Sequence, residues 1–355
     1  MRKVLVSAFF LLISILTFSQ KNPVAEITRL ITRQEVEAHL TFLASDEMRG
    51  RNTGSPELEI AANYIAAQFK LMGLKPVPSL ISYFQTVPLE NVYPATNGKL
   101  TLADESFGYK EHFVILEGGN QTWSGEVVYV GYGSADELKA ANVKDKMVIA
   151  LAGSKDSEGN PMAIFNASNE KFKNVKEAGA AGLVEIFASP QIPWAALVNY
   201  FANNTSMRVK GADGVSIPHL WLKGGESIAL SKIKEQSLSG SLAIEGIKQV
   251  DIPSRNVLGV LEGSDPKLKN EYLVVSAHYD HVGVQKNAKA GTDSIFNGAR
   301  DNAIGVVGML ATAKYLSQYP PKRSVLFVAW TAEEKGLLGS KYYSENPVIP
   351  MKQTV

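Results

Sequence analysis

Largely apolar segments alternate with helix-like segments along the final part of this chain, and no other feature constrains the fold as strongly. The apolar segments lie at 256–263, 271–278 and 324–330, and residues with helical periodicity lie at 303–318 and 336–345. Strands that are apolar along their whole length are typical of a sheet with both faces covered. Since helices alternate with these strands, the pattern predicts an α/β fold with a mixed sheet flanked by helices.

The first part of the chain contains two further helical segments. Residues 34–47 have a helical pattern, which the glycines of 48–57 interrupt. Ser55 is a suitable N-cap with Pro56 in the first helical position, and an apolar face then recurs until Gly73, a residue that favours the end of a helix. We expect this second helix to pack on the sheet.

The middle of the chain has a different pattern. A strand-like segment at 82–89 leads into it. Strand-like segments at 125–133 and 146–153 follow, and then a helical segment at 169–179. Residues 189–225 are rich in Pro, Asn and Gly and predict loops, and His219 beside Pro218 is expected to be structural rather than a ligand. We therefore predict a β-rich domain at 96–250, inserted between two parts of one α/β domain at 20–95 and 251–355.

The N-terminus has the pattern of a secretory signal. Arg2 and Lys3 precede an apolar segment, and Thr17 and Ser19 are small residues at the positions that favour cleavage. Residues 1–19 are thus expected to be a cleaved signal peptide, which predicts a secreted or periplasmic protein. An uncleaved membrane anchor is the alternative, although the apolar segment is short compared with the roughly 20 residues that span a bilayer.

Composition excludes several functional classes. The chain has 355 residues and a net charge of +1, so nothing favours binding to nucleic acid or to an anionic membrane. It has no cysteine, which excludes disulfides, thiolate metal ligands and a cysteine nucleophile. A transition metal bound here would need His, Asp and Glu as its ligands.

Three short clusters of histidine and acidic residues accompany the strands and helices of the final part. They lie at 276–283 (SAHYDHVG), 298–305 (GARDNAIG) and 330–340 (WTAEEKGLLGS). Ligands of open α/β sheets bind outside the carboxyl ends of the strands, and the first and third clusters follow strand ends. A single carboxylate at a strand end is usually solvated, but two clusters after strand ends and a third at the start of a helix together predict a metal site.

The chemistry of the side chains suggests a role for each. His278 is a neutral imidazole ligand, and Asp280 is placed to accept its other ring N–H and fix its orientation. Asp301 could bridge two metal ions, and Glu334 could hold the second ion. Glu333 could act as general base toward water and return the proton to a leaving amine. Two ions about 3.5–4 Å apart would acidify water and polarise a carbonyl.

These motifs resemble those of metallopeptidase family 28, the di-zinc aminopeptidases and their carboxypeptidase relatives. That family has H-x-D, G-x-x-D-N-x-x-G and E-E-x-G-L-x-G-S in this order, which here are 278–280, 298–305 and 333–340. The resemblance extends to 39–55 (HLTFLASDEMRGRNTGS), to the helix after it and to the strand at 256–263. The middle block resembles a protease-associated (PA) domain inserted into the zinc-exopeptidase-like fold.

The resemblance implies a ligand set for two zinc ions. It assigns His278 to one zinc and Glu334 to the other, with Asp301 between them, and it makes Glu333 the general base and Asp280 the residue that orients His278. It also implies a cis peptide bond between Asp301 and Asn302.

Two features depart from the family pattern. Arg300 precedes Asp301 where relatives often have an acidic or small residue, and it is expected to be a surface residue. The family supplies a further Asp and His beyond the E-E motif, whereas here no Asp follows Asp301 and the last histidine is His281. We expect that the C-terminal part of the peptidase domain is missing, leaving an apolar sheet edge exposed, and that His281 lies too close to His278 to replace the absent histidine.

The sequence therefore predicts a secreted zinc metallopeptidase whose partners are peptide substrates, most simply an aminopeptidase that releases N-terminal residues. A carboxypeptidase-type amide hydrolase of the same family is one alternative, and a non-catalytic binding protein is the other. Glutaminyl cyclases also belong to the family, but the E-E motif together with an inserted domain favours hydrolysis. No stable membrane partner is expected after signal cleavage.

Overall fold

The computed structural model describes residues 23–157, 160–211, 217–224 and 238–355, and the chain separates into two compact units. The first unit consists of Met1–Pro88 and Pro253–Val355, and the second consists of Leu89–Ile252. The insertion expected at 96–250 falls within the second unit, and its assignment as a PA domain stays a prediction. The expected signal peptide at 1–19 lies outside the described residues.

The sheet of the first unit is mixed, as predicted. Its strands lie in the order β1 (Phe84–Thr86), β13 (Arg255–Leu261), β17 (Ser324–Trp330) and β14 (Tyr272–His278). The pairs β1–β13 and β13–β17 are antiparallel, and β14 pairs with β17 in parallel. The α/β class of the first unit is thereby confirmed, since this mixed sheet is flanked by helices.

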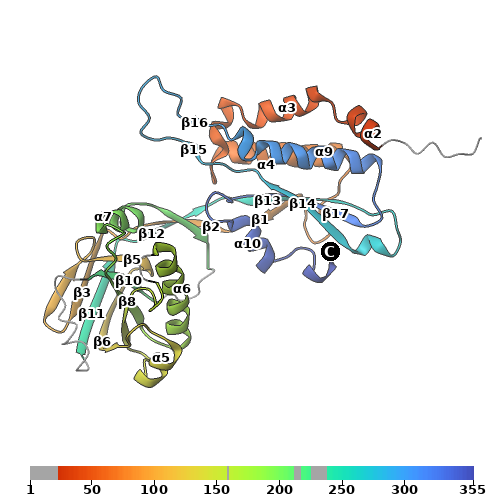
Figure 1. The fold of residues 1–355 in the computed structure, drawn as a ribbon. Coiled ribbons are helices and arrows are strands. Elements are labelled where there is room, and N and C mark those ends of the chain that lie inside the picture. The colour runs from red at the N-terminus through yellow and green to blue at the C-terminus, as the bar shows by residue number, and fades with distance from the viewer. Residues whose placement is uncertain (1–22, 158–159, 212–216, 225–237) are drawn as a thin grey trace, which may run out of the picture. The chain divides into compact units, whose positions relative to one another are not determined.

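Helices cover both faces of this sheet (Figure 1). One face carries α2 (Pro23–Leu30), α3 (Arg33–Leu43), α4 (Pro56–Leu71) and α9 (Ile304–Gln318), and the other carries α10 (Leu338–Glu345). Alternate residues of β17 supply the two cores: Phe327 packs toward α4 and α9, whereas Val328 packs with Tyr343 of α10. This period of two is what an extended strand imposes on its side chains.

Strand β14 lies at the edge of the sheet, and part of its apolar surface is exposed, in agreement with the exposed apolar sheet edge that the sequence analysis expected. Leu273 and Val274 are exposed, whereas Ala277 is buried in the core below α9. The uninterrupted apolar pattern of 271–278 had indicated a strand with both faces covered, which holds for β17 but not for β14.

Local sequence signals explain α4. The Ser55 side chain accepts a hydrogen bond from the backbone N–H of Leu58 at 3.2 Å, and Gly73 follows the helix with a φ of +81°. Its apolar face packs on the sheet, with the Phe69 and Phe327 rings 6.3 Å apart. The preceding helix α3 ends at Leu43, earlier than predicted, because a 3-10 turn (η1, Asp46–Arg51) with left-handed residues follows it.

Short elements complete the first unit. They are η3 (Leu268–Asn270), β15 (Gly283–Val284), β16 (Ile295–Phe296), the π turn η4 (Ala299–Ala303) and η5 (Met351–Gln353). Strands β15 and β16 pair antiparallel, so the predicted loop at 283–300 contains a small hairpin. This hairpin starts at the end of the first cluster of histidine and acidic residues, and η4 lies within the second.

The second unit is built on an eight-stranded sheet. Its order is β4 (Glu105–Gly108), β3 (Asn97–Leu102), β11 (Leu238–Glu245), β6 (Gln121–Tyr129), β7 (Met147–Leu151), β8 (Gly182–Phe187), β10 (His219–Lys223) and β5 (Phe113–Glu117). A three-stranded sheet contains β12 (Lys248–Ile252), β2 (Leu89–Tyr93) and β9 (Ser206–Val209). The helical segments are α5 (Ala135–Ala141), α6 (Pro161–Glu177), α7 (Trp194–Leu197) and the π turn η2 (Val198–Ala202).

Two predictions for this region are wrong. The segment 189–225 was expected to be loops, but it contains α7, η2, β9 and β10, because β10 gains its stability by pairing with β8 and β5, which are distant in sequence. The strand expected at 82–89 is split between β1 and β2. Pro88 lies between them and lacks the N–H that a continuous strand would donate.

A charged cluster lies in the core of the second unit. The fully buried Glu185 carboxylate accepts hydrogen bonds from Lys171 Nζ at 2.5 Å and Trp221 Nε1 at 2.8 Å, and it also bonds the Ser168 hydroxyl. His219 Nε2 lies 2.8 Å from the same carboxylate, and its ring stacks on Phe172. His219 is thus a structural residue, as predicted.

Candidate active site

The parallel pairing of β14 with β17 brings two of the three clusters together. His278, the last residue of β14, is aligned with Trp330, the last residue of β17. Glu333 and Glu334 follow three and four residues beyond this strand end. The two clusters therefore lie at the carboxyl end of the sheet, which is where the sequence predicted them.

Asp280 connects the two strand ends. Its carboxylate is fully buried and accepts hydrogen bonds from the backbone N–H of Glu333 at 3.0 Å and of Glu334 at 3.3 Å. The Thr53 hydroxyl donates a third bond at 3.2 Å. Burial raises the pKa of Asp280 above its ordinary value, while the two backbone donors act in the opposite direction. Asp280 thus fixes the backbone that carries both glutamates.

The orientation of His278 differs in detail from the sequence prediction. Its Nδ1 lies 3.2 Å from the backbone carbonyl oxygen of Asp280, and 3.9 Å from the carboxylate that was expected to accept its N–H. A carbonyl oxygen accepts a proton from Nδ1, so in a neutral His278 the lone pair is on Nε2. That Nε2 atom lies 3.1 Å from Asp301 and 3.8 Å from Glu333.

A second group of possible ligands contains a histidine that the sequence analysis set aside. His281 Nδ1 lies 2.5 Å from Glu334 Oε1, and one ligand atom each of His281, Asp301 and Glu334 lies within 4.8 Å of the other two. Asp301 is thus close to both histidines. The H-Y-D-H spacing places His281 just beyond the end of β14, three residues after His278, and only the path of the chain there shows that the two imidazoles reach different neighbours.

The turn that presents Asp301 has an unusual backbone. The peptide bond between Asp301 and Asn302 is cis, as the resemblance implied. The Asn302 side chain accepts a hydrogen bond from the backbone N–H of Gly305 at 3.1 Å, which ties the turn to the start of α9. The Asp301 side chain is exposed, with 65% of its surface accessible. It is therefore available to a ligand from solvent.

Arg51 is a residue of this region that sequence reasoning missed. Its buried guanidinium donates to the carbonyl oxygens of Tyr279 at 3.0 Å, Asn297 at 2.8 Å and Gly298 at 3.0 Å, and also to that of Leu43. Burial lowers its pKa to about 10, and the charges of Asp280 and Asp301 act in the opposite direction. Arg51 thus links the loop that carries Asp280 to the loop that leads to Asp301.

The donor set fits a zinc site. Two imidazoles and three carboxylates converge without any thiolate, and imidazole with carboxylate is a ligand combination found in catalytic zinc sites. The carbonyl oxygen of Asp280 orients the Nδ1 side of His278, so Nε2 is the nitrogen that a neutral His278 would offer to a metal.

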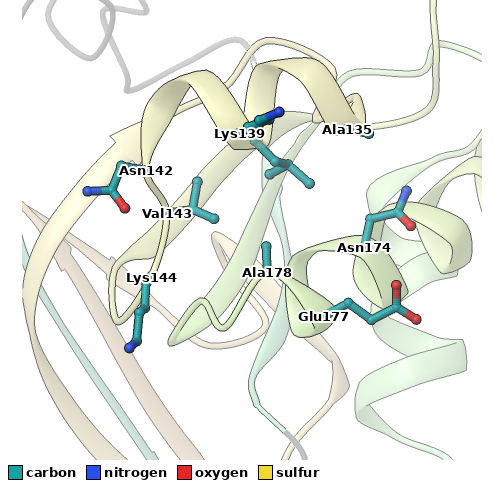
Figure 2. Close-up of a pocket in the computed structure, with 9 residues that line it drawn as sticks. Ala135, Lys139, Asn142, Val143, Lys144, Asn174, Glu177 and Ala178 are labelled. Carbon is teal, nitrogen blue, oxygen red and sulfur yellow. The ribbon is translucent and has the colours of Figure 1, made fainter.

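The second unit contains a pocket whose lining differs from the histidine and carboxylate groups of the first unit. It has a volume of about 360 Å³ and lies beside α5 and the end of α6 (Figure 2). Lys139, Lys144 and Glu177 are the charged side chains of its lining, which includes no histidine. None of the possible metal ligands of the first unit lines it, so it does not enter the metal chemistry.

Among the described residues, no helix has the length and apolar character needed to cross a bilayer.

Comparison with known proteins agrees with the geometry of the first unit. Residues 256–355 match the sequence model of peptidase family M28. The chain is 35% identical over 115 residues to a probable leucine aminopeptidase 2 of Aspergillus oryzae, covering 32% of this chain and 20% of the relative. It is 29% identical over 177 residues to aminopeptidase YwaD of Bacillus subtilis, covering 50% of this chain and 32% of that protein.

The chain also aligns with a solved structure. The aminopeptidase from Aneurinibacillus sp. strain AM-1 is 20% identical and aligns with 90% of this chain and 67% of its own, with a TM-score of 0.49. The chain spans a third or less of the length of the two curated relatives.

Proposed function

We propose that this chain belongs to a secreted zinc metallopeptidase that releases N-terminal residues from peptides. The premise is that residues 256–355 form a segment of peptidase family M28. The observation that carries the proposal is the convergence of His278, Asp301, Glu333 and Glu334 at the carboxyl ends of β14 and β17. The aminopeptidase relatives support the direction of attack from the amino terminus.

The zinc ligands in this proposal are His278, Asp301 and Glu334. His278 offers Nε2, and Asp301 lies between His278 and the Glu334 carboxylate, as a residue shared by two ions would. Zinc, when bound, supplies Lewis acidity that polarises a carbonyl and acidifies water.

Glu333 is the general base. Its carboxylate lies 3.8 Å from His278 Nε2 and is partly exposed. It is therefore next to a proposed zinc ligand and accessible to water. It takes a proton from the attacking water and returns it to the leaving amine when the peptide bond breaks. Asp280 supports this step as a positioning residue, because it fixes the backbone N–H groups of Glu333 and Glu334.

The inserted second unit is, in this proposal, a PA domain, and residues 1–19 direct export. None of the donors described above comes from the second unit, and the proposal assigns it no chemical step.

Replacement of the base provides the test. Glu333→Gln keeps the size of the side chain and cannot accept a proton, so turnover of amino-acid p-nitroanilides should fall by about 10²–10⁴-fold while bound zinc stays constant. Zinc is measured by atomic emission on the dialysed protein. Glu345→Gln, an exposed change on α10, is the control and should retain full turnover.

Unchanged turnover in Glu333→Gln would exclude its role as the base. Acetylation of the substrate amino terminus should abolish hydrolysis. Hydrolysis of acetylated peptides from the carboxyl end would instead identify the carboxypeptidase-type activity, and a wild-type protein without bound zinc would contradict the proposal as a whole.

A further inference from the structure

We infer that Asn256 is a positioning residue for the turn at 331–339, which carries Glu333 and Glu334. The inference rests on the proposed function for the roles of the two glutamates, and it adds a residue outside the three clusters of histidine and acidic residues. Asn256 is the second residue of β13 and is fully buried. A buried side-chain amide is costly unless its polar atoms are bonded, so its partners indicate what it holds in place.

The Asn256 side chain joins the two ends of this turn. Its Oδ1 atom accepts a hydrogen bond from the backbone N–H of Thr331 at 3.2 Å, and its Nδ2 atom donates to the carbonyl oxygen of Gly339 at 2.9 Å. Thr331 directly follows β17, and Gly339 is the second residue of α10. One amide from β13 thus connects the end of a strand to the start of a helix, and both glutamates lie in the segment between them.

Backbone hydrogen bonds close the turn at the same place. The N–H of Gly339 donates to the carbonyl oxygen of Thr331 at 3.1 Å, and that of Leu338 donates to the carbonyl oxygen of Ala332 at 3.0 Å. Ala332 and Leu337 have φ values of +54° and +60°, in the left-handed region. Residues with a side chain stay in that region only where the surrounding structure holds them there. The turn therefore needs contacts that fix it, and Asn256 supplies two of them.

Gly339 allows the Asn256 amide to reach the turn. A Cβ atom at Gly339 would lie 2.6 Å from Asn256 Oδ1 and closer still to the carbonyl oxygen of Thr331. A side chain at this position would therefore push the amide and the turn apart. The second glycine of the E-E-x-G-L-x-G-S motif thus has a physical role, because it permits contact with a residue that lies far from the motif in sequence.

A neighbouring amide fixes the orientation of Asn256. Its Nδ2 atom also donates to Gln85 Oε1 at 3.0 Å, and Gln85 Nε2 donates to the carbonyl oxygen of Asn346 at 2.8 Å. Because the oxygen atoms of Gln85 and Gly339 only accept, they select the NH₂ end of the amide and leave its oxygen for the Thr331 N–H. Aspartate has almost the same shape as asparagine but lacks both N–H donors.

The turn is thus held from two strands. The Asp280 carboxylate, just beyond the end of β14, accepts the N–H groups of Glu333 and Glu334, and Asn256 on β13 holds the two ends of the turn. The position of the proposed base relative to His278 depends on both contacts. Loss of an outer contact of this kind typically lowers metal affinity or activity by about 10–100-fold.

The test compares Asn256→Asp with the natural chain in hydrolysis of an amino-acid p-nitroanilide. Both proteins are assayed at saturating zinc and at a temperature at which circular dichroism shows that they are folded. We expect kcat to fall by about 10–100-fold while KM changes by less than about twofold, because the displaced group acts on the chemical step.

Val257→Ala is the matched control on the same strand. The Val257 side chain is buried in the core on the other face of the sheet, so its truncation lowers stability without removing a contact of the turn. This variant should keep its kcat. Unchanged kcat in Asn256→Asp would overturn the inference, and so would an equal loss of kcat in Val257→Ala, since that would identify a general effect of stability.

Hydrogen exchange of the natural chain gives a second readout, which needs no substitution and decides the matter if Asn256→Asp does not fold. After metal has been removed by a chelator, the N–H groups of Thr331 and Gly339 should exchange as slowly as those of β17, because both require unfolding of the sheet. Faster exchange at Thr331 and Gly339 than along β17 would overturn the inference. A natural chain that binds no zinc and hydrolyses no substrate would instead overturn the proposed function, while slow exchange would still show that the turn is held.

Discussion

The Asp280 carboxylate orients the backbone of Glu333 and Glu334 rather than the imidazole of His278. The H-x-D motif suggested that its carboxylate would hold His278, but the carboxylate accepts the N–H groups of Glu333 and Glu334, and its own carbonyl oxygen faces the imidazole. One residue thus orients groups from two strands. A sequence motif can identify such a residue, but it cannot show which of its atoms make the contacts.

Arg51 has a comparable role with a positive charge. Removing its guanidinium leaves buried carbonyl oxygens at Tyr279, Asn297 and Gly298 without a donor. Each unsatisfied buried group costs roughly 1–3 kcal/mol, so Arg51→Met should destabilise the first unit by about 3 kcal/mol or more. Urea unfolding followed by circular dichroism measures this loss.

Arg49→Met is the matched control, two residues earlier in the same turn. Arg49 is 60% exposed and its nearest carboxylate, on Glu57, is 3.7 Å away, so its replacement should change the free energy of unfolding by less than about 0.5 kcal/mol. Equal effects of the two changes would show that the buried carbonyl contacts of Arg51 do not stabilise the loops.

At the scale of elements, the buried cluster of Glu185 ties α6 to β8 and β10. Glu185→Gln leaves Lys171 as an uncompensated buried charge, which should cost about 3–5 kcal/mol. Glu177→Gln removes an exposed partner of Lys173 on the same helix and should cost less than about 0.5 kcal/mol. Urea unfolding monitored by tryptophan fluorescence compares them, and a stable Glu185→Gln protein would contradict the assigned role.

The same cluster predicts a pH dependence. Burial tends to raise the pKa of Glu185, but the hydrogen bond to His219 and the charge of Lys171 outweigh it and lower the pKa to about 2. A carboxyl with a depressed pKa stabilises the folded state above its ordinary pKa and loses this effect as the pH falls. The stability difference between the natural chain and Glu185→Gln should therefore shrink between about pH 4.5 and 2. A constant difference across this range would refute the assignment.

Elements with local signals were predictable from the sequence, and elements that depend on distant partners were not. Helix α4 is marked in the sequence by the N-cap Ser55 and by Gly73 after its last turn, and β17 is apolar from Val325 to Trp330. Strand β10 is short and follows a proline, so only its pairing with β8 and β5 makes it a strand. The contact of His281 with Glu334 was missed for a related reason, since the direction of the His281 side chain depends on contacts of its loop with Arg51 and Gly298.

At the scale of the whole molecule, the two units have separate cores. The core of the first unit contains buried residues from 43–77 and 257–349 alone, and the cores of the second unit contain residues from 95–244 alone. The ends of the second unit meet, because Leu89 and Ile252 are paired in register between β2 and β12. The polypeptide thus leaves the first unit and returns to it at nearly one point.

This arrangement predicts that the second unit folds by itself. Residues 89–252 expressed alone should show a single cooperative urea transition and the secondary structure described above, measured by circular dichroism. Replacing Glu185 by Gln in this fragment should lower its stability as it does in the full chain. A fragment without a cooperative transition would show that its core depends on the rest of the protein.

The meeting of Leu89 and Ile252 also has an evolutionary consequence. A gene segment encoding a unit with adjacent ends can enter or leave a host gene without forcing the host polypeptide to change its path. Ancestors with and without the segment could therefore both have been viable, and selection could act on the inserted unit while the chemistry of the host remained constant.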